Sequence, residues 1–253
     1  MGIKVPELTI FFWIVKVLTT GMGEATSDYL VHTIDPYIAV GIGAAGFLIA
    51  LLLQLAMRRY IAWIYWLAVV MVAVFGTMAA DVLHVRLGIP YVVTTAFYAL
   101  ALTVVFITWY RTEGTLSIHS IHTTRRELFY WATVLATFAL GTAASDLTAY
   151  TLHLGFLASG ILFAVVIAVP AIGYRIGALK ELLAFWFAYV ITRPLGASFA
   201  DWLGVPRSLS GLNLGRGRIA LSLTVFIIGF VVYLSISRVD VHPERVPPAG
   251  HGA

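Results

Sequence analysis

Residues 12–28 read FWIVKVLTTGMGEATSD, an apolar segment in which an aromatic-Trp pair, a glycine and an aspartate follow at fixed distances. Written from Trp13 through Gly23 to Asp28, the spacing is Trp-x9-Gly-x4-Asp. With an aromatic residue again before each Trp, the same spacing returns at Trp66, Gly76 and Asp81, at Trp131, Gly141 and Asp146, and at Trp186, Gly196 and Asp201. The chain holds seven Trp and six Asp, and four of each stand in this register. The pattern therefore indicates four copies of one structural unit.

The composition predicts a membrane protein. Of the 253 residues, 60% are hydrophobic and only 11% are charged, and the mean hydropathy is +0.94. A soluble domain carries about 25% charged residues, so this chain cannot cover a water-facing surface. There is no cysteine, which excludes disulfides and thiolate metal sites. The net charge of +4 is expected to reflect basic residues held at one membrane face, with the lipid bilayer rather than nucleic acid as partner.

Eight apolar spans of roughly 20 residues are long enough to cross a hydrocarbon core about 30 Å thick. The spans lie at approximately 8–31, 37–57, 61–84, 90–110, 127–152, 155–174, 181–203 and 218–238. Short polar or Gly/Pro-containing breaks separate them. We predict an all-α, polytopic fold with one transmembrane domain over residues 1–238. Its repeats are expected at about 8–57, 61–110, 127–174 and 181–238, followed by a disordered cytoplasmic tail over residues 239–253.

The distribution of Lys and Arg predicts the orientation. Ten basic residues fall on the side of the termini and the even-to-odd loops, and four on the other side: Lys4, Arg58, Arg59, Arg111, Arg125, Arg126, Arg175, Lys180, Arg238 and Arg245 against Arg86, Arg207, Arg216 and Arg218. The positive-inside rule then places both termini in the cytoplasm. Each Asp lies about 22 Å beyond its Trp, toward the external face. All four repeats enter from one side, so we expect parallel repeats with pseudo-rotational symmetry, either four-fold or two-fold.

The first span concentrates its polar groups on one helical face, which holds Lys16, Thr20 and Glu24 with Asp28 at its edge. Thr77 and Thr142 lie on the equivalent faces of the second and third repeats. Lipid cannot satisfy such groups, so these faces should turn toward protein or a water-filled cavity. The candidate ion pathway comprises Asp28, Asp81, Asp146, Asp201, Glu24, Lys16 and Arg193. With all seven ionised its net charge is −3 (five negative, two positive), which requires protonation, ion pairing or a bound cation.

The other repeated residues suggest packing. Small residues allow helices to approach closely in membranes, which fits Gly23, Gly76, Gly141 and Gly196. Trp13, Trp66, Trp131 and Trp186 are expected to serve packing or to anchor the helices at the interface. The four Asp could also be structural, as caps or loop contacts. His32, His84 and His153 follow the first three Asp, and carboxylates with imidazoles would suit a transition metal; ordinary loop histidines are the competing interpretation.

Three functions are compatible with these features. The first is a secondary transporter or exporter of a small cation. Divalent metals and coupling to protons are included in this hypothesis, with Glu24 and Lys16 as a coupling pair and Arg193 as counter-charge. The second is a non-transport scaffold or sensor subunit with structural Asp and Trp. The third is a haem- or quinone-associated protein that uses the external histidines. No Walker, dinucleotide-binding, His-Glu-x-x-His or nucleophile-elbow motif occurs, so we expect no enzyme; the cofactor stays open.

The four tandem two-helix units, each marked by one Trp in a fixed register, give the chain a family resemblance. It resembles a bacterial membrane-protein family built from four copies of a two-transmembrane repeat of unknown function, whose members are labelled uncharacterised membrane-anchored proteins. The resemblance covers about residues 8–238, with Trp13, Trp66, Trp131 and Trp186 at the matching positions. It implies the architecture and a bacterial inner membrane, and it implies no activity, cofactor or catalytic residue.

Overall fold

The computed structural model describes residues 2–241, except for the side chains of residues 85 and 86. Within this part the protein is all-helical without a strand, as predicted. The eight long helices are α1 (Ile10–Thr33), α2 (Pro36–Ala56), α3 (Ala62–Asp81), α4 (Tyr91–Glu113), α5 (Thr124–Asp146), α6 (Gly155–Arg175), α7 (Glu181–Gly204) and α8 (Arg216–Ser237). Short helical turns join some of them: η1 (Val82–Arg86), η2 (Ile118–Ser120), η3 (Leu147–Thr151) and η4 (Arg207–Leu209).

Local sequence signals set several helix ends. The Asp35 side chain accepts hydrogen bonds from the first amides of α2, with Pro36 at the first helical position, a favourable N-terminal combination. Thr123 caps α5 by accepting from the amide of Arg126. Gly114 ends α4 with φ +70°, a left-handed conformation that glycine adopts without steric cost.

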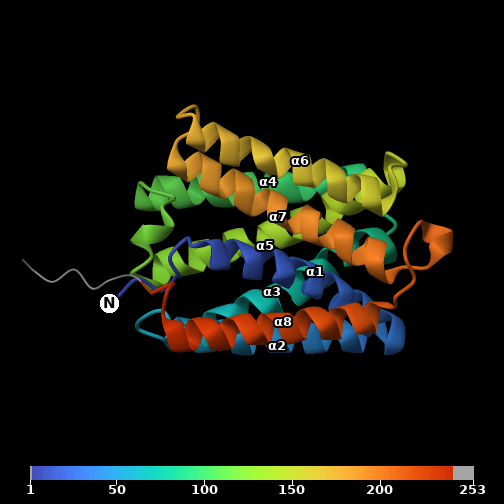
Figure 1. Ribbon diagram of the computed structural model, residues 1–253, viewed down its shortest axis with the longest axis horizontal. Helices are drawn as coiled ribbons and strands as arrows, with labels where there is room; N and C mark the ends of the chain where they lie inside the picture. The colour runs from blue at the N-terminus through green and yellow to red at the C-terminus, as the bar shows by residue number, and fades with distance from the viewer. Residues whose placement is uncertain (1, 242–253) are drawn as a thin grey trace, which may run out of the picture.

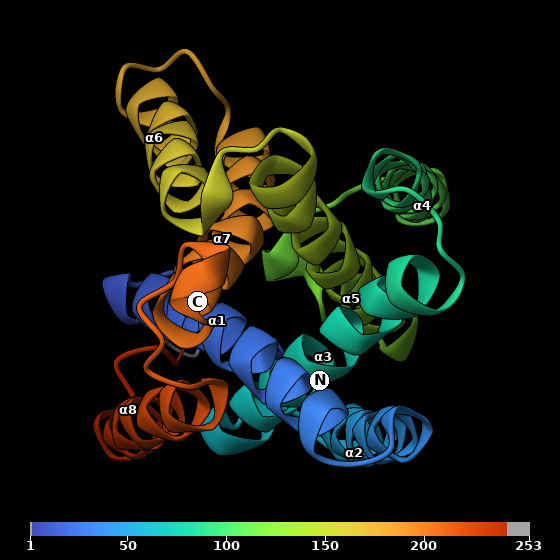
Figure 2. The same ribbon diagram turned by 90° about the vertical axis from the view of Figure 1, so that its right-hand side faces the viewer.

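The four odd-numbered helices form a closed inner ring. Helix α1 packs on α3, α3 on α5, α5 on α7, and α7 on α1 again. The even-numbered helices lie outside, and each packs mainly on the odd helix that follows it: α2 on α3, α4 on α5 and α6 on α7. Helix α8 closes the circle by packing on α1 (Figures 1 and 2). Each repeat therefore shares its main outer contact with the next repeat.

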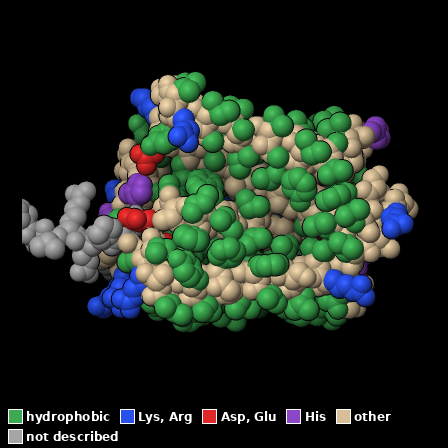
Figure 3. Space-filling model, in the orientation of Figure 1, with side chains coloured by type: hydrophobic (Ala, Val, Ile, Leu, Met, Phe, Trp, Pro, Cys, Tyr) green, Lys and Arg blue, Asp and Glu red, His purple; other side chains and the backbone are tan. Residues whose placement is uncertain are grey.

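Seven helices are long and apolar enough to cross a membrane. Of the eight predicted spans, the first departs from this description, because α1 is not among the seven and carries Lys16, Glu24 and Asp28. Helix α1 is enclosed by α3, α7 and α8, so its polar groups lie against protein rather than lipid. Figure 3 shows hydrophobic side chains over the middle of one face and the charged side chains at its two ends, the distribution that a bilayer requires.

Near the N-terminal ends of the odd helices, the repeated aromatic residues form a second ring. The residue before each Trp contacts the Trp of the next repeat at 5.7–6.4 Å between ring centroids: Phe12 with Trp66, Tyr65 with Trp131, Tyr130 with Trp186, and Phe185 with Trp13. Trp66, Trp131 and Trp186 are buried and Trp13 is partly buried. Three of the four Trp thus lie inside the protein, not at its surface as interfacial anchors would.

The repeated glycines lie where neighbouring odd helices are closest. A Cβ added to any of them would come within 3.0 Å of the next helix in the ring: Gly23 faces Ala73, Gly76 faces Phe138, Gly141 faces Arg193, and Gly196 faces Thr20. Helix contact at this distance leaves no room for a side chain. The glycines therefore set the diameter of the inner ring at its middle.

Lys4 and Asp240, near the two ends of the described part, are both packed into the protein. Lys4 is buried and donates to Glu127 Oε2 at 2.5 Å, and Gln54 donates to Glu127 Oε1 at 2.9 Å. The Tyr60 hydroxyl donates to Asp240 at 2.5 Å, and burial raises the pKa of the Asp240 carboxyl. The prediction of disorder from residue 239 is thus wrong at its start, because Asp240 is packed against Tyr60. Residues 242–253 lie outside the described part.

Candidate functional site

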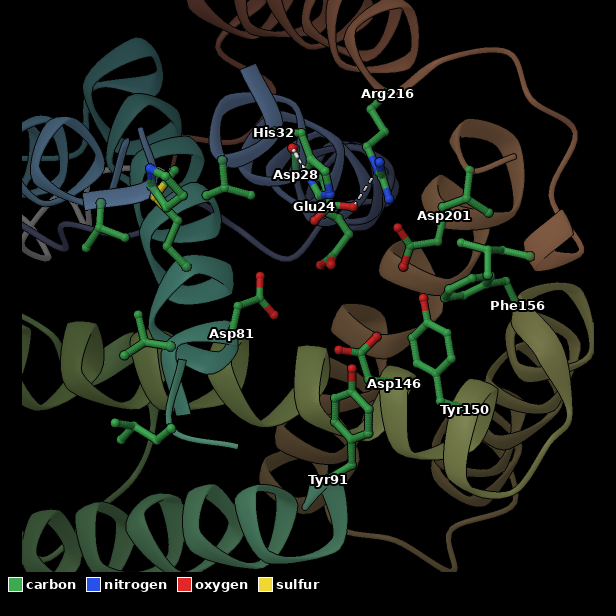
Figure 4. Close-up of a pocket in the computed structure, with 18 of the residues that line it drawn as sticks. Glu24, Asp28, His32, Asp81, Tyr91, Asp146, Tyr150, Phe156, Asp201 and Arg216 are labelled. Carbon is green, nitrogen blue, oxygen red and sulfur yellow. Dashed lines mark hydrogen bonds and ion pairs between the residues drawn. The ribbon is translucent and has the colours of Figure 1, made fainter. Parts of the chain in front are cut away.

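A cavity of about 770 Å³ lies at the C-terminal ends of the odd helices, and one carboxylate from each repeat lines it. These are Asp28 of α1, Asp81 of α3, Asp146 of α5 and Asp201 of α7, joined by Glu24 one turn deeper. Figure 4 shows the acids on different sides of one central space. They meet because four parallel helices in one ring carry Asp at the same distance from the glycine contact.

Three of the four aspartates have no partner within the described residues. Asp28 pairs with Arg216 at the start of α8, with 2.8 Å between Oδ2 and Nε. Asp81, Asp146 and Asp201 make no side-chain hydrogen bond or ion pair there, and Asp201 is only 5% exposed. The five carboxylates and the guanidinium groups of Arg193 and Arg216 together carry a net charge of −3 when all seven groups are ionised. The cavity is therefore suited to a cation or to protons.

Glu24 lines the inner end of the cavity, and Arg193 holds it in an ion pair. Arg193 is fully buried, and its Nη2 lies 2.5 Å from Glu24 Oε2. The same guanidinium donates to the carbonyl of Thr20 at 3.0 Å, to Thr142 Oγ1 at 2.6 Å and to Thr77 Oγ1. The group thus joins helices α1, α3, α5 and α7 at one point of the axis.

Lys16 does not pair with Glu24, which corrects the predicted coupling pair. Its Nζ lies 4.1 Å from the ring centre of Phe138 and 4.3 Å from that of Tyr189, and it has no hydrogen-bond partner in the described structure. The Lys16 side chain is 1% exposed and does not line the cavity. Glu24 pairs with Arg193 of the neighbouring helix α7 instead, because the Arg193 side chain reaches the level of Glu24. Lys16 lies two turns away from Glu24 on α1 itself.

Replacing Lys16 with methionine is expected to leave the free energy of unfolding unchanged or to raise it by up to about 2 kcal/mol. A buried amino group without an acceptor costs about 1–3 kcal/mol, and methionine keeps contact with both aromatic rings. Unfolding of the purified protein by SDS in mixed micelles measures the change.

Lys4→Met is the matched control, because Lys4 is equally buried but paired with Glu127. Removing it leaves a buried carboxylate unpaired and should cost about 3–5 kcal/mol. Equal losses in the two variants would show that Lys16 is also stabilised by a partner.

The cavity walls are aromatic and apolar between the acids. Tyr91 and Tyr150 stack at 5.8 Å between ring centroids, and their hydroxyls point toward Asp146 and Asp201 in Figure 4. Phe156 and Met78 also contribute to the lining. Tyr150 belongs to η3, a π-helical turn directly after Asp146, and η1 is a π-helical turn directly after Asp81. Such turns are rare and cluster at functional sites.

The three histidines do not form the predicted metal centre. The described residues contain no group of three or more His, Asp or Glu side chains arranged to hold a metal ion. His32 lines the cavity, but its Nδ1 lies 2.7 Å from the carbonyl of Asp28. His84 bonds the carbonyl of Ile89 and stacks on Tyr91, and neither it nor His153 lines the cavity. Their irregular distances from the aspartates place them at different depths.

Sequence reasoning did not single out Arg216, Tyr91 or Tyr150. In the sequence Arg216 is only one of the external basic residues, because its contact with Asp28 depends on α8 packing on α1. Tyr91 and Tyr150 follow Asp81 and Asp146 at unequal distances, so no repeat signal marks them. Thr77 and Thr142 had a signal, because each directly follows a repeat glycine.

A ring of helices around an acidic cavity, in a bundle of which seven helices are apolar enough to cross a membrane, defines the protein as a helical bundle of the membrane type. The chain belongs to the family described as Repeat of Unknown Function (DUF347), whose model matches residues 11–60, 64–115, 129–176 and 184–240. This confirms the resemblance seen in the sequence. No curated protein and no solved structure matched the chain.

Proposed function

We propose that the protein is a secondary transporter of a small cation, and that the cavity lined by the four aspartates is its binding site. The observation that carries the proposal is the convergence of Asp28, Asp81, Asp146 and Asp201 on one space. Intramembrane carboxylates are costly and persist where they serve a pathway. Three of the four lack a partner in the described residues, so they are available to a cation.

The geometry of the two ends supports alternating access. The cavity lining extends from buried Glu24 to Tyr37 and Leu87, which are 76% and 64% exposed, so the cavity opens at that end of the bundle. Beyond the Glu24–Arg193 pair, the ring of aromatic contacts closes the other end. A transporter needs one open and one closed side in each state, and this arrangement corresponds to one such state.

The proposal includes the orientation and the symmetry. Helix contacts, aromatic contacts and glycine contacts all run in the same cyclic order through the four repeats, which favours pseudo-fourfold symmetry about the membrane normal over a two-fold arrangement. The excess of basic residues on one side supports cytoplasmic termini, and the family resemblance supports a location in a bacterial inner membrane. The acidic cavity then faces the external side.

Replacing the unpaired aspartates with asparagine tests transport. Asp81→Asn, Asp146→Asn and Asp201→Asn should each lower the initial rate of cation uptake into proteoliposomes at least tenfold, because each removes a full negative charge from the site at nearly constant volume. Uptake of manganese, sodium and organic amines is measured with and without a proton gradient.

Asp35→Asn is the matched control, since Asp35 caps α2 outside the cavity and asparagine caps equally well. Wild-type flux in all three cavity variants would contradict the proposal. Loss of folding without any measurable flux in the parent would favour the alternative, a scaffold or sensor subunit in which the ion pairs Arg193–Glu24 and Arg216–Asp28 only hold helices together.

A further inference from the structure

We propose that the ligand of the cavity is an organic cation with two or more amino groups on an apolar frame, rather than a bare metal ion. This inference rests on the proposed function, since it names the substrate class of the same site. Three features of the cavity support it: its volume, the separation of its carboxylates, and its aromatic walls.

The volume excludes a close fit to a single ion. The cavity measures about 770 Å³, within the roughly 300–1,000 Å³ typical of sites for small organic molecules. A divalent metal instead requires several oxygen or nitrogen ligands at about 2.0–2.6 Å from one point. No such group of ligands occurs among the described residues, so a bare ion would leave most of the space and most of the acids unused.

The negative charge is distributed rather than focused. Asp81, Asp146 and Asp201 come from three different helices and stand on different sides of the space in Figure 4. Asp201 is 5% exposed, has no hydrogen-bond partner among the described side chains, and points into the cavity. Separate carboxylates match separate ammonium groups, each of which donates up to three hydrogen bonds. A ligand with one amino group would satisfy only one side.

Aromatic and apolar side chains cover the walls between the acids. The stacked rings of Tyr91 and Tyr150 and the ring of Phe156 lie beside Asp146 and Asp201. Ring faces attract ammonium groups, and apolar walls favour methylene segments over water. A hydrated metal ion would gain from neither. The walls therefore favour a cation that carries hydrocarbon between its charges.

Binding of spermidine to the purified protein in detergent tests the inference by calorimetry, with butylamine and Mn²⁺ as comparison ligands. Spermidine should bind at least tenfold more tightly than butylamine, because it reaches more than one carboxylate. Asp81→Asn and Asp146→Asn should each weaken spermidine binding about tenfold or more. Tyr150→Leu should weaken it about threefold or more and leave Mn²⁺ binding unchanged. Asp35→Asn, outside the cavity, should change nothing.

The outcomes separate this inference from the transport proposal. Equal affinity for spermidine and butylamine, or Mn²⁺ binding that depends on the cavity aspartates and that spermidine does not displace, would overturn the organic ligand. Aspartate-dependent Mn²⁺ flux without spermidine binding would do the same and leave cation transport standing. Spermidine binding with the expected dependence on Asp81, Asp146 and Tyr150, but without flux in proteoliposomes, would support the ligand class and overturn transport.

Discussion

Replacing Arg193 with methionine is expected to lower the free energy of unfolding by about 3–5 kcal/mol. The guanidinium is fully buried and bonds Glu24, Thr142 and the carbonyl of Thr20. Removing one partner of a buried ion pair leaves the other charge uncompensated, and this penalty exceeds the loss of the pair itself. SDS-induced unfolding in mixed micelles, followed by tryptophan fluorescence, measures the change.

The double variant Arg193→Met with Glu24→Gln separates charge from packing. It should recover a substantial part of the lost stability, because the buried carboxylate disappears together with its partner. Arg193→Lys should remain destabilised, since an ammonium cannot reproduce the planar fork that reaches α1, α3 and α5 together. Additive losses in the double variant would show that the pairing of Arg193 with Glu24 contributes no stability of its own.

Gly23→Ala is expected to destabilise the protein by about 1–3 kcal/mol. The new Cβ would lie 2.8 Å from the carbonyl carbon of Ala73 and 3.1 Å from its Cα, so the backbone of α3 must move. Overpacking of this kind costs about 1–3 kcal/mol, partly offset by the higher helix propensity of alanine. The same unfolding measurement reports the change, and ligand binding reports whether the ring has widened.

Gly41→Ala is the matched control, because Gly41 also lies inside a helix but has no atom within 4 Å of an added Cβ. This change should be neutral or stabilise the protein by up to about 1 kcal/mol. A similar loss in both variants would mean that helix flexibility, not the contact between α1 and α3, sets the requirement for glycine.

The repeat made the architecture and the position of the acids predictable. Trp, Gly and Asp at constant distances on parallel helices must lie at three common depths, so the sequence predicts one level for the four aspartates and leaves open whether they share a cavity. The same reasoning located Thr77 and Thr142 on the inward faces. The repeat could not predict which side chains of different helices lie at the same level and pair with each other.

Glu24 illustrates that limit. A helical wheel relates Glu24 to Lys16, because both belong to α1, and it contains no information about the neighbouring helix. Arg193 precedes Asp201 by eight residues, yet its long side chain reaches Glu24, which precedes Asp28 by four. The contact between Arg216 and Asp28 likewise depends on how the last helix meets the first. Such pairings follow from tertiary packing and carry no local signal.

The packing of α8 on α1 has a consequence for biosynthesis. Among the eight long helices of the described part, α1 is the one that is not apolar enough to cross a membrane by itself, and α8, which covers its outer side, leaves the ribosome after the other seven. Until residues 216–237 have been synthesised, the first helix lacks its cover, and Asp28 lacks the Arg216 partner. A chain released before α8 would therefore present its first helix to quality-control proteases.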